Sequence, residues 1–288
     1  MQKTQLTRLI DILKYSTDLL ASKGFHESRL NVELLMADVL NCDRMKLYLD
    51  FEKPLNVEER NKFKNALIRR LNHEPLQYIT GKTNFFGYDI KVNKSVLIPR
   101  PETEILVEEI LKDIYLSAKK QIRIFEIGTG SGCISIALSK ETEKRGIECK
   151  IDAIEISKDA IEIAEINAKN NNVPNGNINF IHQDFFDIEK IEKEYNYIVA
   201  NPPYISISDF LQLDKDVKNF EPRFALTDEN DGLTFYKKIQ NLTKESKSSV
   251  FLEIGYNQEK SLREIFTNNN LVFKKDYSGI TRIMIIRK

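Results

Sequence analysis

The first quarter of the chain carries the hydrophobic periodicity of amphipathic helices. Apolar residues recur every three or four positions, at Leu6, Leu9, Ile10 and Leu13 and again at Leu30, Leu34 and Leu35. Ser28 is predicted to cap a helix, and Asn56 followed by Glu59 has the spacing of a capping box. We therefore expect a small helical bundle domain over residues 1–74, which is either a packing appendage or a module that docks a large substrate.

A linker is expected next, over residues 75–95. The loose alternation of apolar and polar positions over 83–92 indicates a β-hairpin within this linker. Beyond it, the Pro-Arg-Pro sequence at 99–101 forms a stiff loop, because each proline fixes its own backbone φ angle. Arg100 in this loop is either a surface charge or part of a cleft, and a helix is predicted to begin directly after it.

From residue 122 onward, short apolar runs alternate with helical stripes. Seven runs are predicted strands, at 122–127, 151–156, 178–182, 197–200, 250–254, 271–273 and 283–286. This alternation predicts an α/β fold with a parallel sheet and crossover helices. We assign residues 96–288 to this second domain.

Four polar side chains fall at or near the ends of successive predicted strands. They are Glu126, Glu155, Asp184 and Asn201. Open α/β sheets bind their ligands outside the carboxyl ends of the strands. Together these residues therefore outline a binding crevice.

The loop after the first predicted strand is rich in glycine: Gly128, Thr129, Gly130, Ser131 and Gly132. Glycines there let the backbone turn sharply and pass close beneath a ligand. The spacing G-x-G-x-G is not the G-x-G-x-x-G of dinucleotide-binding proteins, and the lysine of a P-loop is missing. A diphosphate ligand is therefore disfavoured.

The acidic residue just before these glycines, Glu126, suits an ammonium group rather than a phosphate. It favours S-adenosylmethionine, which carries an amino-acid group and a sulfonium, with S-adenosyl-L-homocysteine as the product. Glu155 is then placed for the ribose hydroxyls, Asp184 for the adenine amine and Phe185 for packing on the adenine ring. Asn201 adjoins the same crevice and is included among the cofactor-binding residues.

The sequence Asn201-Pro202-Pro203-Tyr204 ends a buried strand on a rigid backbone. Its polar groups suit the transfer of a methyl group to a planar NH2 group. The side-chain oxygen of Asn201 and the carbonyl of Pro202 can accept both N–H bonds, and Tyr204 can pack on the planar group. We predict Asn201, Pro202 and Tyr204 as catalytic residues, and all four residues as the substrate-binding loop.

Composition narrows the class of protein. Lys plus Arg and Asp plus Glu each number 43, so the net charge of zero weakens the case for stable nucleic-acid binding. Cys42, Cys133 and Cys149 form no CxxC pair, and this odd, sparse set favours reduced thiols in the cytoplasm. No metal-ligand spacing, signal peptide or apolar run long enough to span a membrane is found, so we expect no metal and no membrane association.

At this point the chain resembles the HemK/PrmC family, the glutamine methyltransferases of peptide chain release factors. The resemblance covers nearly the whole chain and rests on segments 74–81, 98–104, 128–134, 201–204, 221–226 and 231–233. It departs from the family's usual pattern at Glu126 and Glu155, where aspartate is more frequent, and at Phe185, where some members have tryptophan.

The resemblance implies a seven-stranded Rossmann-like class I methyltransferase sheet preceded by the helical domain and hairpin linker. It also implies methylation of the glutamine side-chain amide in the Gly-Gly-Gln motif of class 1 release factors. Separately, we expect the protein to be a monomer. Two alternatives stay open: an adenine amino-methyltransferase acting on nucleic acid, and a non-catalytic S-adenosylmethionine-binding partner of the translation machinery.

Overall fold

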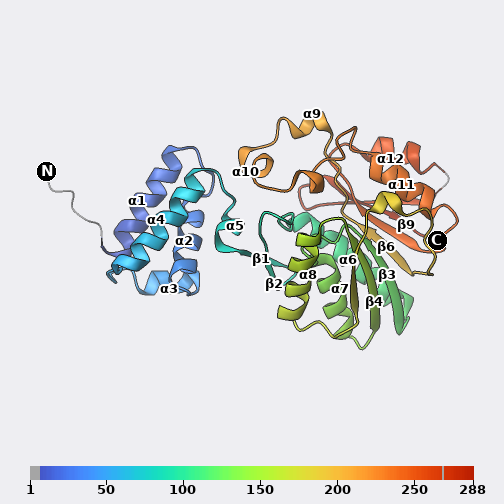
Figure 1. Ribbon diagram of the computed structural model, residues 1–288, viewed down its shortest axis with the longest axis horizontal. Coiled ribbons are helices and arrows are strands. Elements are labelled where there is room, and N and C mark those ends of the chain that lie inside the picture. The colour runs from blue at the N-terminus through green and yellow to red at the C-terminus, as the bar shows by residue number, and fades with distance from the viewer. Residues whose placement is uncertain (1–6, 268) are drawn as a thin grey trace. The chain divides into compact units, whose positions relative to one another are not determined.

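The computed structural model describes residues 7–267 and 269–288, so Leu6 of the first predicted stripe lies outside the described residues. The chain divides into two compact units (Figure 1). One contains the described part of Met1–Gly81 together with Lys215–Phe220, and the other contains Lys82–Asp214 and Glu221–Lys288. Within the described residues, no helix combines the length and the apolar character needed to cross a membrane.

The first unit is helical. Its helices are α1 (Leu9–Ser22), α2 (Ser28–Val39), α3 (Arg44–Leu49), α4 (Val57–Leu71), α5 (Leu76–Thr80) and α10 (Lys215–Lys218). Asp216 on α10 accepts from Arg70 at 2.7 Å and contacts His73 at 2.8 Å, which attaches this distant segment to the unit.

The two predicted helix caps of this unit have different outcomes. The capping box at α4 is confirmed, since Asn56 Oδ1 accepts from the backbone N–H of Glu59 and the Glu59 carboxylate accepts from that of Asn56. The predicted cap at Ser28 is wrong. Ser28 is the first helical residue, and Glu27 occupies the N-cap position instead, without a side-chain cap hydrogen bond. The Ser28 hydroxyl donates to the carbonyl of Phe25 at 2.7 Å.

The second unit opens with the predicted hairpin, formed by β1 (Lys82–Phe85) and β2 (Tyr88–Lys91). A seven-stranded sheet follows in the order β5-β4-β3-β6-β7-β9-β8. Its strands are β3 (Gln121–Ile127), β4 (Glu148–Glu155), β5 (Ile178–His182), β6 (Tyr197–Ala200), β7 (Ser249–Glu253), β8 (Leu271–Lys275) and β9 (Thr281–Ile286). β9 pairs antiparallel with both β7 and β8, and the other strand pairs described in this sheet are parallel. The class I methyltransferase fold predicted for this region is confirmed.

Helices cover the sheet (Figure 1). They are α6 (Pro101–Ser117), α7 (Cys133–Glu143), α8 (Lys158–Asn170), α11 (Thr234–Thr243) and α12 (Glu259–Ile265), with short α9 (Ile207–Phe210) and 3-10 turns at Phe185–Asp187 and Arg223–Ala225. Ser157 caps α8 by accepting from the N–H of Ala160. On one face, Tyr236 and Leu262 of α11 and α12 join a core cluster with Phe125 of β3.

The strand register decides what lies together at the carboxyl edge. Ile127, the last residue of β3, pairs with Ala200, the last residue of β6. The glycine loop and Asn201 therefore leave the sheet side by side, at the point where the strand order reverses. Ala200 also pairs with Leu252 of β7, which brings Glu253 beside Asn201.

Candidate functional site

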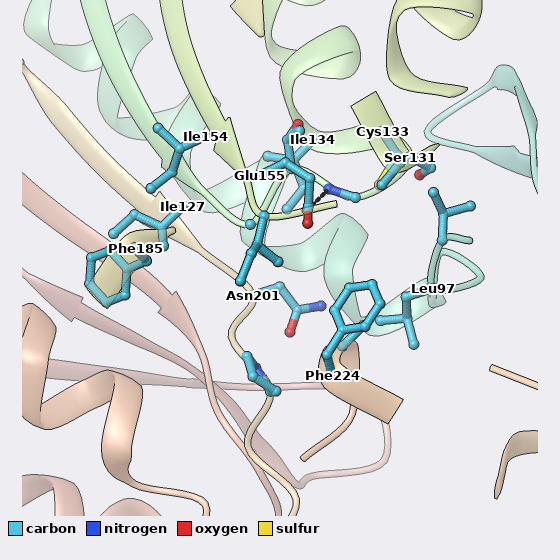
Figure 2. Close-up of a pocket in the computed structure, with 18 of the residues that line it drawn as sticks. Leu97, Ile127, Ser131, Cys133, Ile134, Ile154, Glu155, Phe185, Asn201 and Phe224 are labelled. Carbon is cyan, nitrogen blue, oxygen red and sulfur yellow. Dashed lines mark hydrogen bonds between the residues drawn. The ribbon is translucent and has the colours of Figure 1, made fainter. Parts of the chain in front are cut away.

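A cavity lies at the carboxyl ends of the central strands (Figure 2). Nine of the predicted site residues line it: Gly128, Thr129, Gly130, Ser131, Glu155, Asp184, Phe185, Asn201 and Pro203. Gly132, Pro202 and Tyr204 are not among the lining residues. Figure 2 shows Glu155, Asn201 and Phe224 around the same space, with Phe185 toward one end and Leu97 toward the other.

The three glycines of the loop differ in role. Gly128 and Gly130 have φ angles of 73° and 53°, and a Cβ atom at either position would meet nothing within 4 Å. They therefore permit a left-handed backbone beside open cavity space. Gly132 has φ of 79°, but a Cβ there would lie 3.1 Å from Ala164 Cβ. Its small size thus allows the loop to pack against α8.

Glu155 anchors the glycine loop. Its Oε2 accepts from the backbone N–H of Gly130 at 3.0 Å, and its Oε1 accepts from that of Ser157 at 3.0 Å. A carboxylate oxygen has two acceptor sites, so each of these oxygens retains capacity for a ligand hydroxyl.

The end of β5 supplies an acidic side chain and an aromatic cluster. Asp184 Oδ1 accepts from the N–H of Phe186 at 2.8 Å and so fixes the short turn after β5. Phe185 lines the cavity and stacks on Phe235 of α11 at 5.8 Å between ring centroids. Phe235 was not identified from the sequence; it also lines the cavity.

Glu126 lies behind the cavity lining. It is 1% exposed, and its Oε2 accepts from the hydroxyls of Ser135 and of Thr129, the latter at 2.9 Å. Its Oε1 is buried with no hydrogen-bond partner among the described residues. Burial raises the pKa of this carboxyl to about 7, and the two hydroxyls oppose that rise.

Asn201 belongs to a buried polar chain that the sequence did not reveal. Its Nδ2 donates to Thr103 Oγ1 at 3.2 Å, and Thr103 Oγ1 donates to Glu253 Oε2 at 2.7 Å. The hydroxyl of Tyr204 donates to the other oxygen of Glu253 at 3.2 Å. Tyr204 therefore contacts Glu253, the carboxylate at the end of the hydrogen-bond chain that begins at Asn201. A signal for Glu253 was available, because it ends a strand as Glu155 does.

The Pro-Arg-Pro loop also contributes to the cavity. Pro99 and Arg100 line it, and the Arg100 guanidinium donates to Glu221 Oε1, which places this arginine in the cleft rather than free on the surface. Glu221 Oε2 accepts from the backbone N–H of Ile98 at 3.3 Å. One carboxylate thus holds both the side chain and the backbone of the loop.

These residues fit S-adenosylmethionine. The unpartnered oxygen of Glu126 provides negative charge beneath the glycine loop that an ammonium would complement, and the space beside Gly128 and Gly130 leaves their backbone open to a ligand. Glu155 offers carboxylate acceptors for hydroxyls, and Phe185 places an aromatic ring in the cavity lining. No group of three or more metal-ligating side chains occurs among the described residues.

Comparisons with known proteins show to which family the chain is similar. Residues 11–81 match the family model of the PrmC N-terminal domain, and residues 101–213 match that of the methyltransferase small domain. A Release factor glutamine methyltransferase of Fusobacterium nucleatum is 38% identical over 288 residues, covering 97% of this chain and 78% of that protein. One from Thermodesulfovibrio yellowstonii is 39% identical, covering 88% of this chain and 90% of that protein.

Among solved structures, the hMettl16 catalytic domain in complex with MAT2A 3'UTR hairpin 1 has a TM-score of 0.56 and 16% identity. The alignment covers 94% of this chain and 91% of that one. At this identity the similarity concerns the fold alone, and it supports the methyltransferase architecture.

Proposed function

Since the chain belongs to the release factor glutamine methyltransferases, we propose that its cavity brings S-adenosylmethionine and the glutamine amide of a release factor together at Asn201. The enzyme methylates a glutamine of a release factor, and we assign this glutamine to the Gly-Gly-Gln motif of class 1 release factors. One observation carries the site assignment: Ile127 pairs with Ala200, so the glycine loop and Asn201 emerge next to each other.

The loop after β6 provides the acceptors for the substrate amide. The nitrogen of an amide is a poor nucleophile, because its lone pair is delocalised into the carbonyl. Asn201 Oδ1 and the Pro202 carbonyl would accept its two N–H bonds, orient the nitrogen and stabilise positive charge that develops on it. Pro202 is buried and Pro203 lines the cavity, so the backbone of this loop has little freedom to move.

The loops after β3, β4 and β5 would hold the cofactor. When bound, S-adenosylmethionine supplies the methyl group from its sulfonium. Gly128 and Gly130 let the backbone approach it, Glu155 binds the ribose hydroxyls, and Asp184 with Phe185 binds the adenine. Glu126 acts on the ammonium through its charge, because Thr129 lies between Glu126 and the cavity.

The alternative of an adenine methyltransferase receives no support from a specific observation. We also place the enzyme in the cytoplasm, because its three cysteines are free and a reducing compartment keeps thiols in that state.

The test uses purified protein and S-adenosylmethionine labelled at the methyl group. It is incubated with a class 1 release factor, with the same factor carrying alanine in place of the motif glutamine, and with duplex DNA. Mass spectrometry then locates the label. Label on the motif glutamine alone supports the proposal. Label on DNA, on another residue of the release factor, or on none of the three would overturn it.

A further inference from the structure

We propose that Thr103 and Glu253 are positioning residues that fix the amide of Asn201 with its oxygen toward the substrate. The inference rests on the function proposed above. It concerns the two side-chain atoms of Asn201, of which only the oxygen can accept an N–H bond from a glutamine amide.

The three side chains come from separate elements that meet at the carboxyl edge. Asn201 follows β6, Glu253 ends β7, and Thr103 lies in the first turn of α6. The pairing of Ala200 with Leu252 places Asn201 and Glu253 side by side. Thr103 is 3% exposed and Glu253 is 1% exposed, so water does not compete for their hydrogen bonds.

The donor-to-acceptor direction of these hydrogen bonds follows from the single proton of the Thr103 hydroxyl. An ionised Glu253 can only accept, so Thr103 must donate to it, at 2.7 Å. The remaining capacity of Thr103 Oγ1 is as an acceptor, and it accepts from Asn201 Nδ2 at 3.2 Å. Because an amide is planar, Asn201 Oδ1 then points away from Thr103. This atom becomes the acceptor that the cavity presents.

Protonation of Glu253 would reverse the direction of both hydrogen bonds, from Asn201 to Thr103 and from Thr103 to Glu253. A protonated carboxyl can donate to Thr103, whose hydroxyl would then donate to Asn201 and favour the flipped amide. Burial raises the pKa of Glu253 to about 7, while hydrogen bonds from Thr103 and Tyr204 oppose the rise. The charged groups near it are Glu102, which raises its pKa, and Arg282, which lowers it. The hydroxyl of Tyr236 on α11 donates to the backbone carbonyl of Glu253.

The first experiment compares Thr103→Val with Thr103→Ser. Valine has a similar shape but no hydroxyl, whereas serine retains the hydroxyl. We expect Thr103→Val to lower kcat for glutamine methylation about tenfold, with KM for S-adenosylmethionine and for the release factor within about twofold. Thr103→Ser should recover most of kcat. Thr243→Val is the matched control, because Thr243 is also buried but donates to a helix carbonyl on α11. The inference would be overturned if wild type and Thr103→Val had the same kcat. It would also be overturned if Thr103→Val and Thr103→Ser lost kcat equally.

The second experiment measures kcat for glutamine methylation as a function of pH. Wild-type kcat should rise as pH increases through about 7, and Glu253→Gln should lose this dependence because glutamine does not titrate. An unchanged profile in Glu253→Gln would count against the role of Glu253.

A third measurement does not depend on activity. In protein labelled with 15N-asparagine, the side-chain NH2 signals of Asn201 are identified by their loss in Asn201→Ala. These signals should shift in Thr103→Val and stay near their positions in Thr243→Val. If wild type methylates nothing, the proposed function fails, yet this spectrum still decides whether Thr103 holds the Asn201 amide. Unmoved signals in Thr103→Val would refute the arrangement itself.

Discussion

The backbone N–H of Gly130 donates to Glu155 Oε2 at 3.0 Å, and this bond ties the loop after β3 to the end of β4 (Figure 2). The same carboxylate accepts from the N–H of Ser157. Glu155 therefore shapes the glycine loop in addition to its proposed contact with the ribose.

Removing this carboxylate should weaken cofactor binding. We expect Glu155→Ala to raise the Kd for S-adenosylmethionine about 10- to 100-fold, because hydrogen bonds to a charged group are lost on both the loop and the ribose. Titration calorimetry measures this value. Glu148→Ala, at the other end of the same strand, is the control and should bind normally. An unchanged Kd in Glu155→Ala would remove Glu155 from the cofactor site.

A side chain at Gly130 should block the cavity. Gly130→Val places a branched group beside the proposed cofactor and should reduce affinity at least about tenfold. Gly176→Val is a matched control, because Gly176 also has a positive φ angle, of 76°, and open surroundings, but does not line the cavity. Both variants carry similar backbone strain, so a loss of binding shared by both would point to strain. It would contradict the proposal that the backbone at Gly130 lies against the cofactor.

Loss of the Asn201 side chain should separate binding from transfer. We expect Asn201→Ala to keep its affinity for S-adenosylmethionine within about twofold and to lose about 100-fold in single-turnover methyl transfer, since one preorganised group at the reacting centre is removed. Full activity of this variant would exclude Asn201 from the mechanism.

Glu126 should make stability depend on pH. Burial raises its pKa from 4.5 to about 7, so between these values the folded protein retains a proton that the unfolded chain has released. Its contribution to stability is present below about pH 4.5 and is lost as pH rises through about 7. Chemical denaturation of wild type and Glu126→Gln at several pH values measures this contribution. The variant should gain stability relative to wild type as pH rises from 4.5 to 7, and parallel profiles would contradict the assignment.

Asn167 should be important for the stability of the second unit. It is 0% exposed, its Oδ1 accepts from the N–H of Lys91 at 2.7 Å, and its Nδ2 donates to the carbonyls of Lys91 and Ser131, each at 2.9 Å. Asn167→Ala leaves these buried groups unpaired and should lower the free energy of unfolding by about 2–4 kcal/mol. Asn170→Ala on the exposed face of the same helix should change it little. Equal stability of the two variants in urea denaturation would refute this prediction.

Local patterns predicted the elements well. The strand at Tyr197–Ala200 and the capping box at Asn56 depend on neighbouring residues, so the sequence contains the information for both. Ser28 shows where local reasoning fails. The helix begins at Ser28 itself, so the N-cap position falls on Glu27, and the Ser28 hydroxyl donates to the carbonyl of Phe25.

The sequence by itself determined the succession of helices and strands, the glycine loop and the rigid loop at Asn201, because these follow from periodicity and from the backbone limits of glycine and proline. Only the tertiary structure decided which chain ends lie together. Strand order and register depend on packing between residues far apart in sequence, and no local pattern encodes them. That packing placed β6 between β3 and β7, with Gly128 on one side of Asn201 and Glu253 on the other.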